Sequence, residues 1–307
     1  MKRQFKKWGL HSGFSLDFVD SYNVIECTFC GFKHLIPIPS PTFLTKVYKK
    51  EFYGKTKPDY FKKQKKDLKW WDMVFEERYE MIEKLLPKPK RSILDIGSGP
   101  GFFLKFGKDR GWETRGVEPS ISAVKYSRSL GLDIANDFFG DKLARKLGKF
   151  DAIHMHGVLE HLPNPKETIK ICYSLLNKGG VLSTSVANDY NPLQLIVKNS
   201  LKIRKWWVVP SQHINYFNIS SITSLVKLQK FKILDVTTTF PMEIFLLMGF
   251  NYIDNDKIGS FCHEKRKNLE FALVKSGYKK LKRKIYKAFA KQNIGRQIEL
   301  IAQKPNR

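Results

Sequence analysis

The sequence predicts an α/β protein built around a largely parallel β-sheet, and three observations lead to this fold class. Ile93, Leu94 and Ile96 are β-formers and are typical of a strand that is buried on both faces. Three glycines follow within five residues, at Gly97, Gly99 and Gly101, and an apolar pattern with helical spacing begins at Phe102. Further strand and helix patterns then alternate along the chain. A strand, a glycine-rich turn and a helix form the first unit of a nucleotide-binding sheet.

The spacing of the glycines indicates which ligand the loop holds. Dinucleotide-binding loops have the pattern Gly-x-Gly-x-x-Gly, whereas this loop has Gly-x-Gly-x-Gly. A phosphate-binding P-loop is excluded because no Lys-Ser/Thr pair follows. Asp95 lies two residues before the loop, where its carboxylate would repel a pyrophosphate. A ligand that carries an amino group fits this position better.

The stretch from Asp95 to Gly101 resembles motif I of the class I S-adenosylmethionine-dependent methyltransferases. The resemblance implies a Rossmann-like sheet of seven strands, of which the last is antiparallel. It also implies that S-adenosyl-L-methionine is the methyl donor and that Asp95 and the loop hold its methionine part. The loop residues expected to contact the donor are Gly97, Ser98, Gly99 and Gly101.

Glu118 is the predicted ribose ligand. It follows the second predicted strand, 113–117, and its distance from the glycine loop is close to the roughly 20 residues at which nucleotide-binding folds place such an acid. A carboxylate can accept hydrogen bonds from both ribose hydroxyls, and Pro119 is expected beside it. Asp137 and Phe138 follow the third predicted strand, 132–134. The resemblance implies that they contact the adenine, and an ordinary turn is the alternative.

The fourth predicted strand, 150–155, leads into His-Gly-Val-Leu-Glu-His, which resembles a signature of the ubiquinone-biosynthesis-like branch of the family. The carboxyl end of this strand lies at the topological switch point, where α/β folds bind ligands. His156 and Val158 are therefore expected to line the donor pocket. Glu160 and His161 either move a proton or orient the site.

A His-x-x-Tyr-Phe pattern begins at His213 and is another feature of this branch. His213 is the predicted general base, because an unperturbed histidine titrates near neutral pH. A histidine that only caps or packs is the alternative. Ser220 is predicted to cap the helix that follows, 221–229.

The N-terminal segment carries one chemical signal, the knuckle Cys27-Thr-Phe-Cys30-Gly. Such a knuckle supplies two ligands to tetrahedral zinc, and a second pair must complete the site. The segment resembles a zinc ribbon that lacks its other Cys pair, so a metal-free hairpin is expected and zinc is not. The residues that could complete a site, if the fold brings them there, are His11, His34, Cys262 and His263.

Aromatic residues recur among lysines after this hairpin, from Tyr48 to Phe61. In the family that the motifs resemble, such a segment can close over the active site. Aromatics that pack a helix onto the core are the alternative. The predicted division of the chain is an appendage over 1–65, a core over 66–239, a helical insertion over 240–293, and a final strand with a tail over 294–307.

Within the insertion, Leu281, Ile285 and Phe289 recur at four-residue steps among Lys and Arg. This basic amphipathic helix either packs on the domain by one stripe or touches an anionic membrane or a partner. The longest apolar run, 244–250, is far shorter than the roughly 20 residues of a spanning helix. Four cysteines form no disulfide framework, which fits a reducing compartment, and a cytoplasmic protein is expected.

The formal net charge of +26 favours polyanionic partners in general. Lys outnumbers Arg throughout the chain, however, and specific phosphate or base recognition favours Arg. No specific nucleic-acid partner is therefore expected, and the sequence does not indicate an oligomeric state.

The expected acceptor is a small molecule. A Cys-x-x-Cys head and a helical insertion resemble methyltransferases of sugar or polysaccharide pathways, and a quinone-like acceptor is the alternative. An RNA methyltransferase and a non-catalytic binding protein with the same fold are the remaining readings. The sequence shows neither an Asn/Asp-Pro-Pro-Tyr/Phe motif nor a catalytic Cys motif for methylation of nucleic-acid bases.

Overall fold

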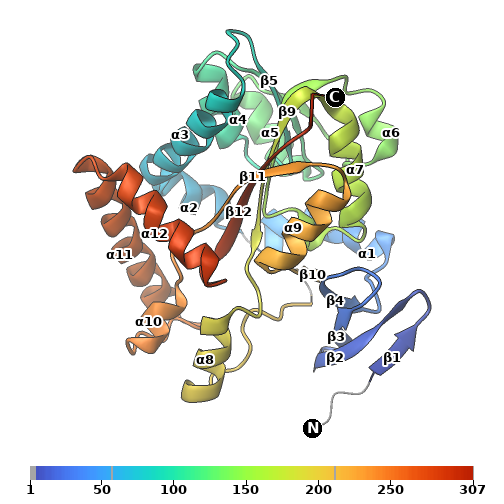
Figure 1. Cartoon of the computed structure of the whole chain (residues 1–307), viewed down its shortest axis with the longest axis vertical. Coiled ribbons are helices and arrows are strands. Elements are labelled where there is room, and N and C mark those ends of the chain that lie inside the picture. Colours follow the sequence, from blue (N-terminus) through green and yellow to red (C-terminus); the bar gives the residue numbers. More distant parts are fainter. Residues whose placement is uncertain (1–4, 57, 211, 307) are drawn as a thin grey trace.

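A computed structural model describes residues 5–56, 58–210 and 212–306, and its centre is a seven-stranded sheet (Figure 1). The strand order is β11-β12-β9-β8-β5-β6-β7, and β12 runs antiparallel to both of its neighbours. The predicted α/β fold with an antiparallel last strand is therefore confirmed. The strands are β5 (Ser92–Ile96), β6 (Glu113–Val117), β7 (Asp133–Ala135), β8 (Phe150–His156), β9 (Leu176–Ala187), β11 (Lys232–Thr238) and β12 (Gln297–Gln303).

Helices cover both faces of this sheet, and each face has its own apolar cluster (Figure 1). Ile93 enters the cluster with α3, α4 and α5, whereas Leu94 enters the cluster with α7 and α9. This alternation explains why the strand pattern is apolar without a polar face. The helices of the two faces are α3 (Leu68–Leu85), α4 (Phe102–Asp109), α5 (Ile121–Ser129), α6 (Asp141–Ala144), α7 (Pro165–Leu175) and α9 (Ile219–Leu228).

The start of α9 differs from the prediction. The N-cap is Asn218 and not Ser220, because the helix already begins at Ile219. The Asn218 side chain accepts a hydrogen bond from the Ser221 amide at 2.9 Å, and the Ser221 hydroxyl accepts one from the Asn218 amide at 3.0 Å. This reciprocal pair is a capping box, which satisfies two amides that a cap at Ser220 would leave open.

The N-terminal appendage is a second, antiparallel sheet whose fifth strand comes from the core. His34 pairs with Asn215, and the Leu35 amide donates to the Ile214 carbonyl at 2.9 Å. The head is therefore joined to the core by backbone hydrogen bonds. Its strands are β1 (Phe5–Trp8), β2 (His11–Val19), β3 (Tyr22–Cys27), β4 (Lys33–Ile36) and β10 (Asn215–Tyr216).

A connecting segment leads from the head to the core through α1 (Pro41–Lys46), the π-helix η1 (Val47–Thr56) and α2 (Tyr60–Lys66). Two short elements flank the carboxyl ends of the central strands. They are the 3-10 helix η2 (Leu159–His161), after β8, and α8 (Pro192–Leu201), after β9.

The insertion before β12 consists of α10 (Glu243–Leu247), α11 (Asp256–Lys275) and α12 (Lys279–Lys291), and α11 and α12 lie beside α3 (Figure 1). The buried stripe of α12 is Lys282, Tyr286 and Ala290, and Leu281 is 43% exposed. The predicted stripe is thus displaced by one residue. Polar contacts to the core cause the shift, since Lys282 Nζ lies 2.6 Å from Glu77 Oε1 of α3.

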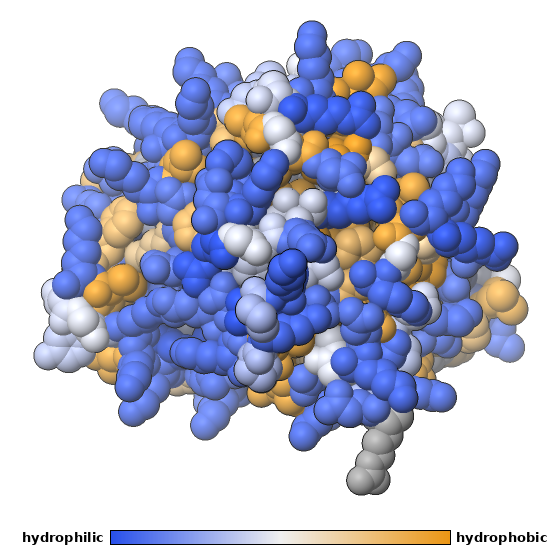
Figure 2. Space-filling view, turned by 90° about the horizontal axis from the view of Figure 1, so that it is seen from above, coloured by the Kyte–Doolittle hydropathy of each residue, from blue (hydrophilic) through white to orange (hydrophobic). Residues whose placement is uncertain are grey.

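No helix in the described part of the chain is long and apolar enough to cross a membrane. Figure 2 shows that hydrophilic side chains cover most of the face in view, with hydrophobic side chains in small separate groups. This distribution fits the large excess of Lys and Arg over Asp and Glu.

Candidate active site

The glycine loop joins β5 to α4 in a conformation that side chains rarely adopt. Gly97, Gly99 and Gly101 have φ values of +70°, +53° and +80°. A Cβ on Gly97 would lie 2.7 Å from a Val158 methyl, and a Cβ on Gly101 would lie 2.6 Å from Leu132 Cδ1. The loop therefore needs glycine for both its backbone angles and its close packing. These contacts also place Val158, a predicted pocket residue, against the loop.

Glu118 ties the loop to the second strand. Its Oε2 accepts a hydrogen bond from the Gly99 amide at 2.9 Å, and its Oε1 accepts one from the Ser120 amide at 2.8 Å. Burial raises the pKa of this carboxyl to about 7, although the two amides oppose the shift. Each oxygen retains a second lone-pair direction, so the ionised group can also accept hydrogen bonds from ligand hydroxyls. This arrangement fits the predicted ribose ligand.

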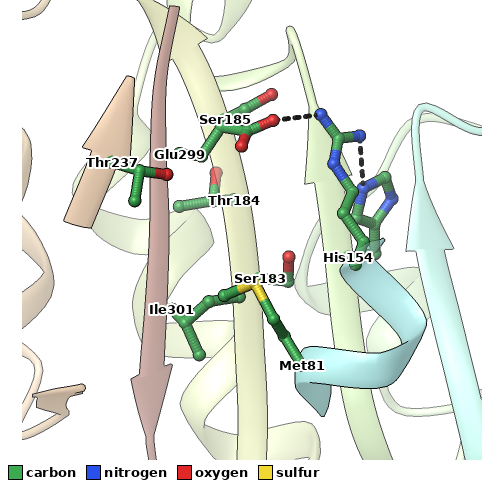
Figure 3. Close-up of a pocket in the computed structure, with 9 residues that line it drawn as sticks. Met81, His154, Ser183, Thr184, Ser185, Thr237, Glu299 and Ile301 are labelled. Atoms are coloured by element: carbon green, nitrogen blue, oxygen red, sulfur yellow. Dashed lines mark hydrogen bonds and ion pairs between the residues drawn. The ribbon is translucent and has the colours of Figure 1, made fainter. Parts of the chain in front are cut away.

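Asp95 precedes the loop in β5 and belongs to a buried polar network, in which its Oδ1 is 2.7 Å from His154 Nδ1. Arg78 bridges His154 Nε2 at 3.4 Å and Glu299 Oε1 at 2.7 Å, and Figure 3 marks both contacts by dashed lines. Burial raises the pKa of Asp95 and lowers the pKa of His154, so His154 is neutral. Because a guanidinium faces Nε2, the proton of His154 is on Nδ1 and points to Asp95. One oxygen of Asp95, the residue predicted to hold the methionine part of the donor, therefore accepts a hydrogen bond from His154. The sequence did not single out His154.

The connecting segment lies over the loop. The Tyr53 hydroxyl is the closest atom to the position of a Cβ on Gly99, at 3.0 Å. Tyr53 also packs on Tyr60 and Phe61, with ring centroids 5.5 and 4.8 Å apart. Burial, with a further contribution from the nearby Glu118 charge, raises the pKa of Tyr60 to about 12. Phe61 also packs on Tyr126 of α5, with ring centroids 5.6 Å apart, so these aromatics pack the segment onto the core as well as lying near the loop. Closure over a bound donor stays a prediction.

Residues at the carboxyl end of β7 form the side of the site predicted for adenine. Asp137 is exposed, and its Oδ1 accepts a hydrogen bond from the Phe138 amide at 2.8 Å. The neighbouring Asn136 donates to the carbonyls of Glu118 and Pro119, both at 3.0 Å. Asn136 thereby holds this turn against the Glu118 strand. The adenine contacts of Asp137 and Phe138 remain predictions.

His156 lies at the end of β8 and hydrogen-bonds to the Ser185 hydroxyl of β9. Burial lowers its pKa well below the usual range, so it is neutral near pH 7. The Trp71 ring lies against it, with centroids 5.7 Å apart. His156 is therefore neutral where β8 ends, and its contact with the donor stays a prediction.

The structure brings the two predicted catalytic histidines together with acidic residues. One polar atom from each of Glu160, His161 and His213 lies within 4.8 Å of those of the other two. His213 Nδ1 is 3.8 Å from Asp189 Oδ2, and His161 Nδ1 is 2.5 Å from the Gln212 carbonyl. Glu160 and His161 follow β8 and Asp189 follows β9, at the carboxyl edge of the central sheet. His213 lies two residues before β10, the strand that the core adds to the N-terminal sheet. Such a group can accept, hold and release a proton.

Backbone contacts hold this acid–base group close to the donor loop. The Ile214 amide donates to the Glu160 carbonyl at 2.8 Å, and Val158 packs against Gly97. The backbone of Glu160 therefore connects the predicted base, His213, to the loop.

The cysteine knuckle lies in the head, apart from the glycine loop. Cys27 and Cys30 lie beside His11 and His34. The other two residues considered for a metal site are in α11, where His263 pairs with Asp67 at 2.9 Å.

Comparisons with known proteins agree with this geometry. A methyltransferase domain model matches residues 70–236. Over 135 residues the chain is 27% identical to a ubiquinone biosynthesis O-methyltransferase of Xanthomonas campestris pv. campestris, covering 39% of this chain and 56% of that protein. A protein of the same name from Xylella fastidiosa is 29% identical over 134 residues, covering 39% and 54%. The chain thus spans about half the length of the curated relatives it matches.

A solved structure, the plantazolicin methyltransferase BpumL in complex with SAH, superimposes with a TM-score of 0.50. The match covers 85% of this chain and 94% of that one at 14% identity, which shows a shared fold. Together with the domain match and the glycine loop, these findings show that the chain belongs to the class I S-adenosylmethionine-dependent methyltransferase family.

Proposed function

We propose that this protein transfers the methyl group of S-adenosylmethionine to a hydroxyl of a small molecule, with His213 as the general base. The observation that carries the proposal is the group of Glu160, His161, His213 and Asp189 beside the glycine loop. Two features fit the donor: the three loop glycines have no side chains of their own that would keep a ligand from the backbone, and Glu118 has lone pairs available for ribose hydroxyls.

The chemistry expected of the protein is positioning and proton transfer. When bound, S-adenosylmethionine supplies an activated methyl group. His213 would take up the acceptor's hydroxyl proton as the oxygen forms its new bond to carbon, with Asp189 Oδ2 at 3.8 Å from its Nδ1. The Asp189 carboxylate then stabilises the imidazolium. Burial raises the pKa of the neighbouring Glu160 carboxyl, and a positive charge on His213 opposes that shift.

We propose a sugar or polysaccharide-pathway intermediate as the acceptor. Oε2 of Glu160 is buried and accepts no hydrogen bond from another described residue. This oxygen fits an acceptor with several hydroxyls, because one hydroxyl can give its proton to His213 while another donates a hydrogen bond to Glu160. A quinol-like acceptor is the second candidate, favoured by the names of the ubiquinone biosynthesis relatives.

A methyl-transfer screen with labelled donor tests the acceptor. Nucleotide-sugars and phosphosugars, catechol-type quinone precursors, and RNA form its three arms. Transfer to a sugar hydroxyl is expected. Transfer to the quinone precursors alone would replace the first candidate by the second, and transfer to RNA alone would contradict both.

Calorimetric titration with S-adenosylmethionine tests donor binding independently of the acceptor. Binding to the wild type is expected, and Glu118→Ala should weaken it by roughly 1–3 kcal/mol because charge-assisted hydrogen bonds are lost. A wild-type protein that does not bind the donor would exclude the enzyme and leave the non-catalytic reading.

A further inference from the structure

Four side chains with metal-binding atoms converge at one end of the N-terminal sheet. His11 begins β2, Cys27 ends β3, Cys30 lies in the turn that follows, and His34 is in β4. One nitrogen or sulfur atom from each lies within 4.8 Å of those of the other three. Both cysteines are free thiols. The fold thus assembles two sulfurs and two imidazoles from three strands and a turn.

The separations between these atoms match those of a tetrahedral zinc site. His11 Nδ1 lies 3.4 Å from the Cys30 sulfur and 3.7 Å from the Cys27 sulfur. Zinc bonds of about 2.3 Å to sulfur and 2.0–2.1 Å to nitrogen place tetrahedral ligands about 3.6 Å apart. The Cys30 amide also points at the Cys27 sulfur, at 3.4 Å. A metal ion would satisfy all of these atoms at once, whereas one ring nitrogen cannot make a full hydrogen bond to both thiols.

His34 gives an independent indication of a ligand. It is 1% exposed, and its Nδ1 lies 2.9 Å from the Leu35 carbonyl. A carbonyl only accepts, so Nδ1 carries the proton and Nε2 carries the lone pair. Nε2 is buried and has no hydrogen-bond partner among the described residues. Metal-bound histidines typically have this arrangement, in which the other ring nitrogen donates to a carbonyl and fixes the ring.

We propose that His11, Cys27, Cys30 and His34 bind one zinc ion. Two thiolates and two imidazoles favour zinc over the hard cations calcium and magnesium, which prefer oxygen ligands. Four protein ligands leave no open coordination position, so the ion is structural. The sequence predicted a metal-free hairpin because a second Cys pair is missing, and here two histidines take its place. The site does not depend on the acceptor proposed above.

The ion would stabilise the junction between the head and the core. His34 pairs in register with Asn215, whose side chain donates to the carbonyls of Leu159 and Leu162 at 2.8 and 2.7 Å. Phe32, two residues before His34, packs on Phe217 with ring centroids 5.2 Å apart. Metal binding is therefore expected to stabilise the pairing of β4 with β10, the strand that His213 precedes by two residues.

Metal analysis of the full chain, purified without a polyhistidine tag, is the first test. One zinc per chain is expected in the wild type, with near-complete loss in Cys30→Ser and His34→Ala. Cys262→Ala is the matched control, because this buried thiol lies in α11 and should leave the zinc content unchanged. Wild-type protein that binds no zinc, even after incubation with the metal, overturns the proposal.

Spectroscopy of wild-type protein keeps the proposal testable if the variants do not fold. Stripped protein is titrated with cobalt(II), and the intense visible bands of tetrahedral cobalt with thiolate charge transfer are expected. Zinc should displace the cobalt and restore the melting temperature lost on stripping. A weak octahedral spectrum, or a melting temperature that zinc does not change, contradicts a closed sulfur–nitrogen site. His11→Cys should retain zinc, since a third thiolate still completes the tetrahedron.

Discussion

Two buried carboxyl groups, Glu118 and Asp95, make hydrogen bonds that organise this site. Glu118 accepts hydrogen bonds from two backbone amides, which favour its ionised form, whereas its burial disfavours that form and raises its pKa. Asp95 is held by a neutral histidine that is itself fixed by Arg78. At the scale of residues, Glu118 therefore fixes the glycine loop through the Gly99 amide, while His154 fixes the Asp95 carboxyl that precedes the loop.

The raised pKa of Glu118 predicts a pH effect on stability. Its folded pKa of about 7 lies above its ordinary value of 4.5, so the folded state binds this proton more tightly than the unfolded state. Stability from this group is present below pH 4.5 and is lost as the pH rises through about 7. Between pH 5 and 8 the free energy of unfolding of the ligand-free wild type should fall by up to about 3 kcal/mol more than that of Glu118→Gln. Urea unfolding at both pH values measures this, and identical pH dependence would contradict the assignment.

His213→Ala should lower kcat about 100-fold or more, because general base catalysis typically contributes that much. Donor affinity should stay within about twofold, since His213 is outside the loop and the Glu118 contacts. His263→Gln is the control, a half-buried histidine in α11 that pairs with Asp67. Steady-state kinetics and calorimetry give the two quantities. An unchanged kcat in His213→Ala would leave this histidine with a packing role.

At the scale of elements, the connecting segment places Tyr53 on the donor loop. Tyr53→Ala should weaken S-adenosylmethionine binding about tenfold, because an aromatic contact worth roughly 1–1.5 kcal/mol is lost. Tyr53→Phe keeps the ring and should bind nearly as the wild type does. Tyr173→Ala is the control, since this ring packs on Phe231 in another part of the protein. Calorimetric affinities that are equal for all three variants would show that the segment does not contact the donor.

The ion pair between Lys282 of α12 and Glu77 of α3 predicts that substitutions of these two residues are coupled. The Lys282 side chain is 5% exposed and opposes the effect of burial, which raises the pKa of Glu77. Lys282→Met should destabilise the fold by roughly 1–3 kcal/mol, because Glu77 is left without its partner. The double variant with Glu77→Leu should recover most of this loss. Lys284→Met, at an exposed position on the same helix, should change the unfolding free energy by less than about 0.5 kcal/mol.

At the scale of the whole molecule, the sequence predicted what long periodic segments and motif spacing determine. The Gly97–Gly101 loop and its spacing to Glu118 led to the fold and the donor, and the fold is confirmed. Features made by few residues were not predicted. The two residues of β10 have no detectable periodicity, and His154 acquires its role only through its register beside Asp95. The stripe of α12 shifted because a buried lysine found a glutamate on another helix.

The strand that β10 adds to the N-terminal sheet has a consequence for building chimeric enzymes. The head is discontinuous in sequence, because its last strand lies more than 170 residues after the rest. Exchanging residues 1–40 alone between related proteins would graft four strands onto a foreign fifth one and would leave its register undefined. A transplant that preserves folding has to carry the segment around Ile214–Phe217 as well. The head and the segment that carries His213 are therefore expected to be inherited together, as two distant pieces of one unit.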